Sequence, residues 1–382
     1  MINACAPPGG IYRPEGEQDE TCKIFRTFDM ATTEQLIGRL KWGVAKVTAM
    51  LAAVLCCTAC GSVFDDEGDC DPRYFVRFVY DMNMLRADAF ATQVSSVDLY
   101  VFDAESGAYV AHLSDKGEAL ASGSYRMPLD LDPGKYDLIA WCGLADNGED
   151  FTVAEAVAQP GDLKCMMARS RDEKGAYSNR NLHALFHGSL SVELPDEEGE
   201  HVVTVKLIKD TNNINLSLNH TAGPLDPDRF VVTMTDANGL MAHDNSLLTD
   251  EQIEYRPWSL RSGTLDVTTS RADASDDDGS NQGSFLKAEI STARLMADHD
   301  CRINIVDKEQ GKVVFSIPLV QWALLLRSDN HASMGDQEYL DREDEYNLMV
   351  FLTDNTGSTD GWMAMEIVIN GWHIINNDGV EF

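Results

Sequence analysis

The chain has 382 residues, 44% of them hydrophobic, so it can bury a core in each of two ordinary domains and still carry a targeting segment. Its formal net charge is -33. Such a surface repels the phosphate backbone of nucleic acids and anionic lipid headgroups. Nucleic acid is therefore excluded as an expected partner, and any membrane attachment must be covalent or hydrophobic.

One segment near the start has the features of a secretory signal peptide. Basic residues at 39–46 lead into a short apolar run, residues 47–55, which is too short to span a bilayer. Because Cys60 follows directly after Thr58-Ala59, the pattern is that of a lipoprotein signal, and we predict that Cys60 carries the lipid. A buried apolar helix is the alternative, which the acidic, turn-rich sequence after Cys60 disfavours.

Two details of this region differ from the usual pattern. Cys57 stands at the third position before the cut, where leucine or valine is usual, so Cys57 is a minor alternative for the acylated residue. A start at Met30 would give a signal peptide of ordinary length. We therefore predict that residues 1–59 are the signal peptide with an upstream extension, that translation starts at Met30, and that residues 60–72 are a lipid-anchored tether.

Four further cysteines follow the lipid site, and in an oxidising periplasm they allow three complete disulfide pairings. They are Cys70, Cys142, Cys165 and Cys301. The sequence does not choose among the pairings, and the alternative is that some of these residues are small buried hydrophobic side chains. Cys142 ends a strand-like run, residues 137–142, so for this residue we favour burial.

Short alternating segments follow the tether. Apolar side chains alternate in residues 74–80 and again in 97–103, which predicts two strands. Within residues 129–141, proline at Pro133 fixes φ for the first corner of a turn and Gly134 accepts a positive φ at the second. This pattern predicts a tight turn between two strands and is found in transthyretin-like sandwiches.

The second half continues in the same way. The polar link 209–212 separates two alternating segments and predicts a domain boundary between residues 210 and 211. Residues 236–239 predict a hairpin-type turn, and residues 319–326 are the one good helix candidate. Further strands are predicted at 285–290, 301–306, 312–317, 346–352 and 363–369. Short strands spaced by turns predict an all-β protein with two β-sandwich domains in tandem, residues 73–210 and 211–382.

Patterns for catalysis or metal binding are weak in this sequence. His183 and His187 have the spacing of a zinc pair on a helix but lack the general-base glutamate of metalloproteases, and the residues after them look like the start of a strand. Residues 276–279 resemble a calcium loop, but Lys287 stands where its bidentate acid is due. We therefore expect no enzymatic activity, metal site or cofactor.

Tryptophans of the second half can make a sugar-stacking surface, because aromatic faces suit the apolar faces of pyranose rings. They are Trp258, Trp362 and Trp372. More often a tryptophan in a β-sandwich belongs to a core or an interface.

Several segments together resemble one family, the fimbrial anchor and minor-subunit proteins associated with major fimbrillins in Bacteroidales. In chain order the segments are CDP (70–72), VRFVYDMNM (76–84), ADAF (87–90), VDLYVFD (97–103), LFHG (185–188), LIKDTNNI (207–214), DQEYLDRE (336–343) and INGW (369–372). The resemblance therefore extends in order over most of the chain after residue 60.

The resemblance implies two transthyretin-like β-sandwich domains in an outer-membrane lipoprotein, exposed at the cell surface, that anchors a fimbrium and limits its length. It also implies fimbrillin subunits as partners, joined by strand exchange. The alternative function is a surface glycan-binding lipoprotein, which would share the export signal, the β-sandwiches and exposed tryptophans.

Strand exchange places a constraint on an anchor. Cutting the first strand near Arg73 or Arg77 would sever the domains from a lipid at Cys60, so we expect the anchor to keep this strand and to contribute by donating one. The candidate donor is the tail 374–382, in which Val380 and Phe382 point to one face. An ordinary frayed terminus is the alternative.

Overall fold

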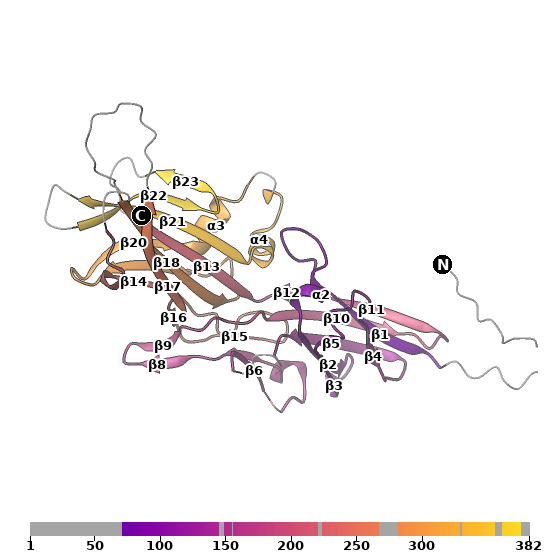
Figure 1. Cartoon of the computed structure of the whole chain (residues 1–382). Coiled ribbons are helices and arrows are strands. Elements are labelled where there is room, and N and C mark those ends of the chain that lie inside the picture. The colour runs from indigo at the N-terminus through magenta and orange to yellow at the C-terminus, as the bar shows by residue number, and fades with distance from the viewer. Residues whose placement is uncertain are drawn as a thin grey trace, which may run out of the picture. The chain divides into compact units, whose positions relative to one another are not determined.

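The computed structural model describes residues 71–144, 149–154, 156–220, 224–266, 282–328, 331–355 and 361–375. The chain divides into two units, Met1–Asp69 and Cys70–Phe382, and the described residues all belong to the second. This unit consists mainly of strands (Figure 1).

The strands of the first half are β1 (Arg73–Val79), β2 (Ser96–Asp103), β3 (Tyr109–Lys116), β4 (Met127–Leu129), β5 (Gly134–Cys142), β6 (Phe151–Val153), β7 (Cys165–Met167), β8 (Ser170–Asp172), β9 (Gly175–Ser178), β10 (Phe186–Leu194), β11 (Glu200–Lys206) and β12 (Ile208–Lys209). Those of the second half are β13 (Thr211–His220), β14 (Phe230–Asp236), β15 (Leu240–Met241), β16 (Ile253–Tyr255), β17 (Ser259–Asp266), β18 (Gln282–Ala293), β19 (Arg302–Asp307), β20 (Lys312–Pro318), β21 (Glu345–Asn355), β22 (Gly361–Ile369) and β23 (Trp372–Ile375). The helices are short: α2 (Phe90–Gln93), α3 (Leu319–Leu325), α4 (Asp336–Arg342) and the 3₁₀ turns η1 (Pro160–Asp162) and η2 (Pro227–Arg229).

Two sheets enclose the first core. One has the strand order β11-β1-β4, and the other has the order β12-β10-β5-β2-β3. Val76 and Phe78 from the first sheet pack in one buried cluster with Leu99 and Leu138 from the second. Since alternate residues of a strand point to opposite faces, these apolar positions face inward and form a β-sandwich.

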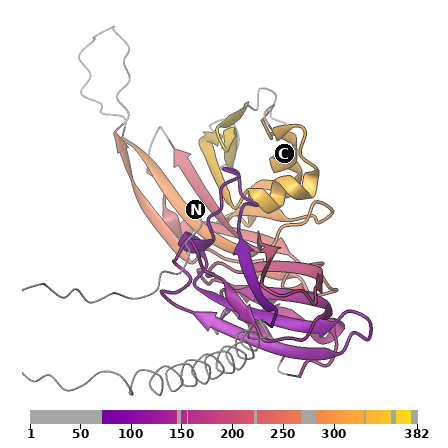
Figure 2. The ribbon, with the colours of Figure 1, turned by 90° about the vertical axis from the view of Figure 1, so that its right-hand side faces the viewer.

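Two six-stranded sheets enclose the second core. Their strand orders are β17-β18-β13-β21-β22-β23 and β20-β19-β14-β16-β9-β8. Leu216, Ile303 and Leu348 are buried in one cluster that draws on both sheets. A small sheet, β15-β7-β6, completes the unit. Figure 2 shows the whole ribbon turned by 90° from the view of Figure 1.

The predicted fold class is confirmed: the protein is all-β and consists of packed sheets. The five strands predicted between residues 285 and 369 are β18 to β22, and the predicted helix is α3. The boundary between residues 210 and 211 stays a prediction. Strands from before it, β7 and β9, pair with β15 and β16 from after it, and Cys70–Phe382 forms one compact unit. The transthyretin-like topology likewise stays a prediction.

Two turn predictions were wrong, because neither turn joins two strands that pair with each other. Gly134 is the first residue of β5 and does not adopt a left-handed φ, and β4 and β5 lie in facing sheets. Residues 236–239 likewise lead from β14 to β15, which belong to different sheets. In a sandwich the chain can cross to the other layer as easily as it can turn back. A local turn signal therefore predicts the bend but not the strand that pairs next.

The cysteines favour the burial alternative. Cys142, Cys165 and Cys301 are buried and unpaired, so the prediction for Cys142 is confirmed. Burial raises the pKa of each thiol, which keeps it protonated and unreactive. Cys70 lies outside the described residues.

Candidate anchoring and assembly site

The first strand after the predicted tether lies in the middle of a sheet. β1 pairs in parallel with β11 over its whole length, from Arg73 opposite Glu200 to Val79 opposite Lys206. On its other edge, β1 pairs with the antiparallel β4 (Figure 1). The chain's own amino-terminal strand therefore fills this position of the first sandwich, and its retention in the mature anchor stays a prediction.

Large apolar side chains hold β1 in place. Tyr74, Val76 and Phe78 are only 2%, 0% and 2% exposed. The ring of Phe78 stacks on Phe90 with centroids 5.8 Å apart, and the Tyr74 hydroxyl donates to the carbonyl of Pro195 at 2.6 Å. Full burial of one such apolar side chain contributes about 1.5–3 kcal/mol. Removal of β1 would therefore open a long apolar groove.

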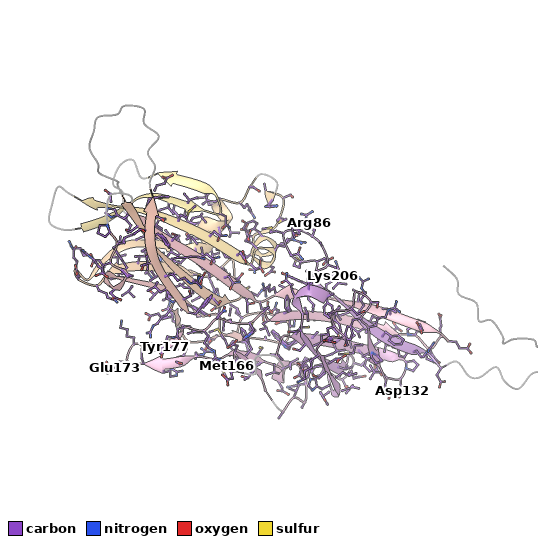
Figure 3. All side chains as sticks on the ribbon, in the orientation of Figure 1. Arg86, Asp132, Met166, Glu173, Tyr177 and Lys206 are labelled. Atoms are coloured by element: carbon purple, nitrogen blue, oxygen red, sulfur yellow. The ribbon has the colours of Figure 1, made fainter. Side chains whose placement is uncertain are left out.

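The outward side chains of β1 and β11 make exposed ion pairs. Arg73 lies 3.1 Å from Glu200, and Lys206, labelled in Figure 3, lies 2.8 Å from Asp81. Exposed pairs of this kind contribute about 0–1 kcal/mol each. The core, rather than this rim, supplies the stability of the strand.

Helix α4 contacts the segment that follows β1. The Arg342 guanidinium donates through Nη1 to the carbonyls of Asp81 at 3.1 Å and Asn83 at 3.2 Å. Its Nε donates to Glu338 one helical turn earlier, at 2.9 Å, which holds the side chain in this orientation. Since α4 lies between β20 and β21 in sequence, these bonds tie the second half of the chain to the end of its first strand.

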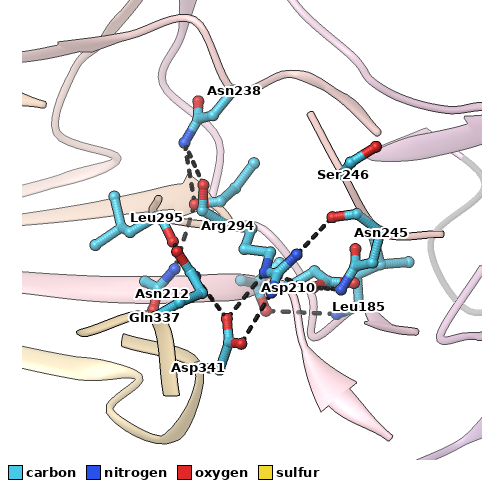
Figure 4. Close-up of polar contacts among 12 residues, drawn as sticks. Leu185, Asp210, Asn212, Asn238, Asn245, Ser246, Arg294, Leu295, Gln337 and Asp341 are labelled. Carbon is cyan, nitrogen blue, oxygen red and sulfur yellow. Dashed lines mark hydrogen bonds and ion pairs between the residues drawn. The ribbon is translucent and has the colours of Figure 1, made fainter. Parts of the chain in front are cut away.

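A buried polar cluster lies near the same helix (Figure 4). Arg294 forms a two-pronged ion pair with Asp341 of α4, through Nε at 2.9 Å and Nη2 at 2.8 Å. Its Nη1 donates to the carbonyl of Asn245 at 2.5 Å. Planar guanidinium and carboxylate groups match well in this geometry. The pair therefore fixes α4 against the end of β18.

Asp210 is the second carboxyl in the cluster. It is fully buried, its Oδ1 accepts from the Asn245 amide at 2.9 Å, and it lies 3.7 Å from Nε of Arg294. Burial is the main cause that raises the pKa of Asp210 to about 7, against the opposing attraction of Arg294. One guanidinium thus faces two buried carboxyls, and the geometry favours a proton on Asp210.

The predicted site residues Cys60, Val380 and Phe382 lie outside the described residues. The predicted donor tail begins inside them, because Ile374 and Ile375 are the last residues of β23. There the backbone of Ile374 is opposite Ile367 of β22. Only the residues after Ile375 are therefore left as a candidate donor segment.

The two histidines of the zinc-like pattern have separate partners. His183 contacts Asp150 at 2.8 Å, whereas His187 contacts the carbonyl of His243 at 2.9 Å and its ring packs edge-on against Trp141. Burial lowers the pKa of His187 to about 4, so it is neutral. Within the described ranges, no three His, Cys, Asp or Glu side chains are grouped to hold a metal.

Of the three candidate sugar-stacking tryptophans, the structure describes the side chain of Trp258 alone. Trp258 is 38% exposed, and the side chains of Trp362 and Trp372 are not among those that the structure describes.

In the described part of the chain, none of the helices is both long and apolar enough to cross a membrane.

The parallel pairing of β1 with β11 and the buried polar cluster were not predicted from the sequence. The sequence did hold a signal for the cluster, because its residues lie in two of the segments that resemble the family. Asp210 lies in segment 207–214, and Asp341 and Arg342 lie in segment 336–343. The structure brings these segments together with the segment at Asp81. Their pairing depends on contacts between residues far apart in sequence, which no local pattern reports.

The described unit is an all-β protein of packed sheets whose two halves are tied by polar contacts. The chain belongs to the family of fimbrillin-A associated anchor proteins Mfa1 and Mfa2, whose model matches residues 66–378. This is a family of structural proteins, not an enzyme family.

Solved structures agree with this assignment. A proposed adhesin from Bacteroides thetaiotaomicron is 33% identical, with a TM-score of 0.68 over 82% of this chain and 100% of that one. A proposed polysaccharide-binding protein from the same species is 29% identical, with a TM-score of 0.65 over 81% of this chain and 99% of that one. The fimbrial anchor protein Mfa2 from Porphyromonas gingivalis is 18% identical and shares the fold, with a TM-score of 0.58 over 80% of this chain and 100% of that one. A search of curated protein sequences finds no match.

Proposed function

We propose that this protein is an outer-membrane lipoprotein that anchors fimbriae to the cell surface and limits their length. Membership of the anchor family supports a fimbrial accessory role. The observation that carries the proposal is the first strand. β1 is buried between β11 and β4, so the sandwich needs no strand from outside to fill this position.

A retained first strand suits a protein that is held at its amino end. In this proposal the lipid is on Cys60, and residues 61–72 span at most about 43 Å to β1 when extended. Cleavage within β1 would release the folded unit from the membrane. With the position of β1 already filled, the end of a fibre can add subunits on one side only.

The proposed partners are fimbrillin subunits, joined through the segment after Ile375. Val380 and Phe382 would enter a groove of the neighbouring subunit, where edge hydrogen bonds and pockets for alternate side chains hold an added strand. The role is structural, without catalysis. The glycan-binding alternative is not favoured, because the family whose model matches this chain is one of fimbrial anchor proteins.

A binding comparison tests the function. The full chain, immobilised, is offered purified fimbrillin subunits and, separately, soluble polysaccharides. The proposal predicts retention of fimbrillin and passage of the polysaccharides. Retention of polysaccharide with no binding of fimbrillin would contradict it and favour the glycan-binding alternative.

A further inference from the structure

The pairing of β1 with β11 has a definite direction. Because the strands are parallel, their amino ends lie together at Arg73 and Glu200 and their carboxyl ends at Val79 and Lys206. Main-chain bonds extend the ladder at both ends, from the Arg73 N–H to the Gly199 carbonyl at 2.8 Å and from the Leu207 N–H to the Val79 carbonyl at 2.8 Å. The two strands are thus joined evenly from end to end.

The chain enters this ladder at one end and leaves it at the other. The proposed lipid site precedes the amino end of β1. The carboxyl end of β11 continues through β12 into β13, which lies inside the six-stranded sheet with β18 on one side and β21 on the other. β23, which precedes the proposed donor segment, belongs to the same sheet. A pull between membrane and fibre therefore acts on the amino end of β1, and the backbone route into the large sheet leaves the ladder at the carboxyl end of β11.

Forces applied at those two ends slide the strands along each other. In that direction every bond of the ladder is stretched together, so the strands separate only when all of them yield. Forces applied at the two amino ends would instead open the bonds one after another. The buried side chains of Tyr74, Val76 and Phe78 add to the resistance, because sliding β1 would withdraw them from the core.

The link between β11 and β13 is short, and polar contacts hold it in place. Lys209 forms an ion pair with Asp344, and the Asp210 N–H donates to the carbonyl of Leu185 at 2.7 Å. Asn245 donates to the Asp210 carboxyl at 2.9 Å. A force that leaves β11 therefore passes into the second half of the unit without first uncoiling a loose connection.

We infer that β1 and β11 form a mechanical clamp that is loaded in shear when a fimbrium pulls on its anchor. The inference rests on the proposed function, because it takes the membrane attachment to precede β1 and the fibre to be held by the second half. The parallel ladder transmits tension from the tether to the large sheet and resists it along its strongest direction.

Single-molecule pulling in two directions tests the clamp on the full chain. Azide-bearing residues serve as attachment points for the pulling handles. In the test protein they replace Asp71 and Lys206, so that the handles lie at opposite ends of the ladder. In the matched control they replace Asp71 and Glu198, so that both handles lie at its amino end. All three positions are exposed. The exposed ion pair that Lys206 makes with Asp81 contributes little, and thermal unfolding of both labelled proteins checks that they are folded alike.

The clamp predicts a rupture force several-fold higher for the Asp71 and Lys206 handles than for the Asp71 and Glu198 handles at the same loading rate. Equal forces, or a lower force for the opposite-end handles, would overturn it. The measurement needs neither lipid nor fimbrillin. An equal-force result would thus leave the anchor function standing, whereas a failure to bind fimbrillin would count against the function and not against the ladder.

Discussion

The guanidinium of Arg342 donates a hydrogen bond to the main-chain carbonyl of Asp81 at 3.1 Å, across 261 residues of sequence. The same group reaches the carbonyl of Asn83. Through this side chain, a helix near the carboxyl end of the unit holds the segment that follows its first strand.

Loss of this contact should destabilise the protein. Arg342→Ala removes the donor from two partly buried carbonyls, and hydrogen bonds to charged groups contribute about 1.5–3 kcal/mol. We expect the free energy of unfolding in urea to fall by about that amount. The control is Arg302→Ala, which removes an exposed arginine paired with Asp300 and should change stability by less than about 0.5 kcal/mol. Equal effects of the two substitutions would show that Arg342 has no special role.

The ion pair between Arg294 and Asp341 should matter more. Asp341→Ala leaves the Arg294 guanidinium buried without its two-pronged partner, and breaking a buried pair from one side costs about 3–5 kcal/mol. We expect a protein that is folded only at low urea or low temperature, as measured by circular dichroism. Asp300→Ala, at an exposed carboxyl, is the matched control. A loss of less than about 1 kcal/mol for Asp341→Ala would mean that Asp210 takes over as the partner of Arg294.

The buried carboxyl of Asp210 should make stability depend on pH. Its pKa is about 7 in the folded protein, against the ordinary value of 3.8 for an aspartate carboxyl. The folded state therefore holds the proton more tightly than the unfolded chain, and this carboxyl lowers stability as pH rises from 3.8 to about 7, with a constant cost above that range. Asp210→Asn is neutral throughout and should escape this loss.

Urea unfolding of wild type and Asp210→Asn at several pH values measures the effect. The variant should gain stability relative to wild type by at most about 1.4 kcal/mol per pH unit across that window, and no more above it. Glu343, whose pKa burial also raises to about 7, is present in both proteins, so its contribution cancels. A pH-independent difference would show that Asp210 stays ionised.

The segment after Ile375 is the proposed donor. Truncation of residues 376–382 spares β23 and should leave a folded, lipidated protein that no longer retains fimbriae on cells, as counted by electron microscopy. Val380→Asp and Phe382→Asp should act in the same direction, because a charge would enter an apolar groove. Glu381→Gln, between them on the opposite face of an extended strand, should have little effect. Normal retention by the truncated protein would refute the donor role and leave the anchor assignment intact.

Alternation of apolar residues was enough to predict the strand at β1, because Tyr74, Val76 and Phe78 do point into one core. It could not predict that β1 pairs with β11, since the pairing joins residues more than a hundred positions apart. The predictions for the turns at Pro133 and Asn238 were wrong for a related reason. The Asn238 amide is fully buried and donates to the carbonyls of Ala293 and Arg294 at 3.2 and 3.0 Å, so distant backbone fixes where this turn leads.

If a lipid on Cys60 holds the fimbria on the cell, Cys60→Ala removes the attachment itself. Several acyl chains give stable anchoring where one chain binds only marginally, each buried CH₂ contributing about 0.8 kcal/mol. Cys60→Ala should therefore move the protein from the membrane to the soluble fraction and its fimbriae from the cells to the medium, while Cys57→Ala should leave both in place. Full membrane retention of the Cys60→Ala protein, with its fimbriae still on the cells, would show that a lipid on Cys60 is not the anchor.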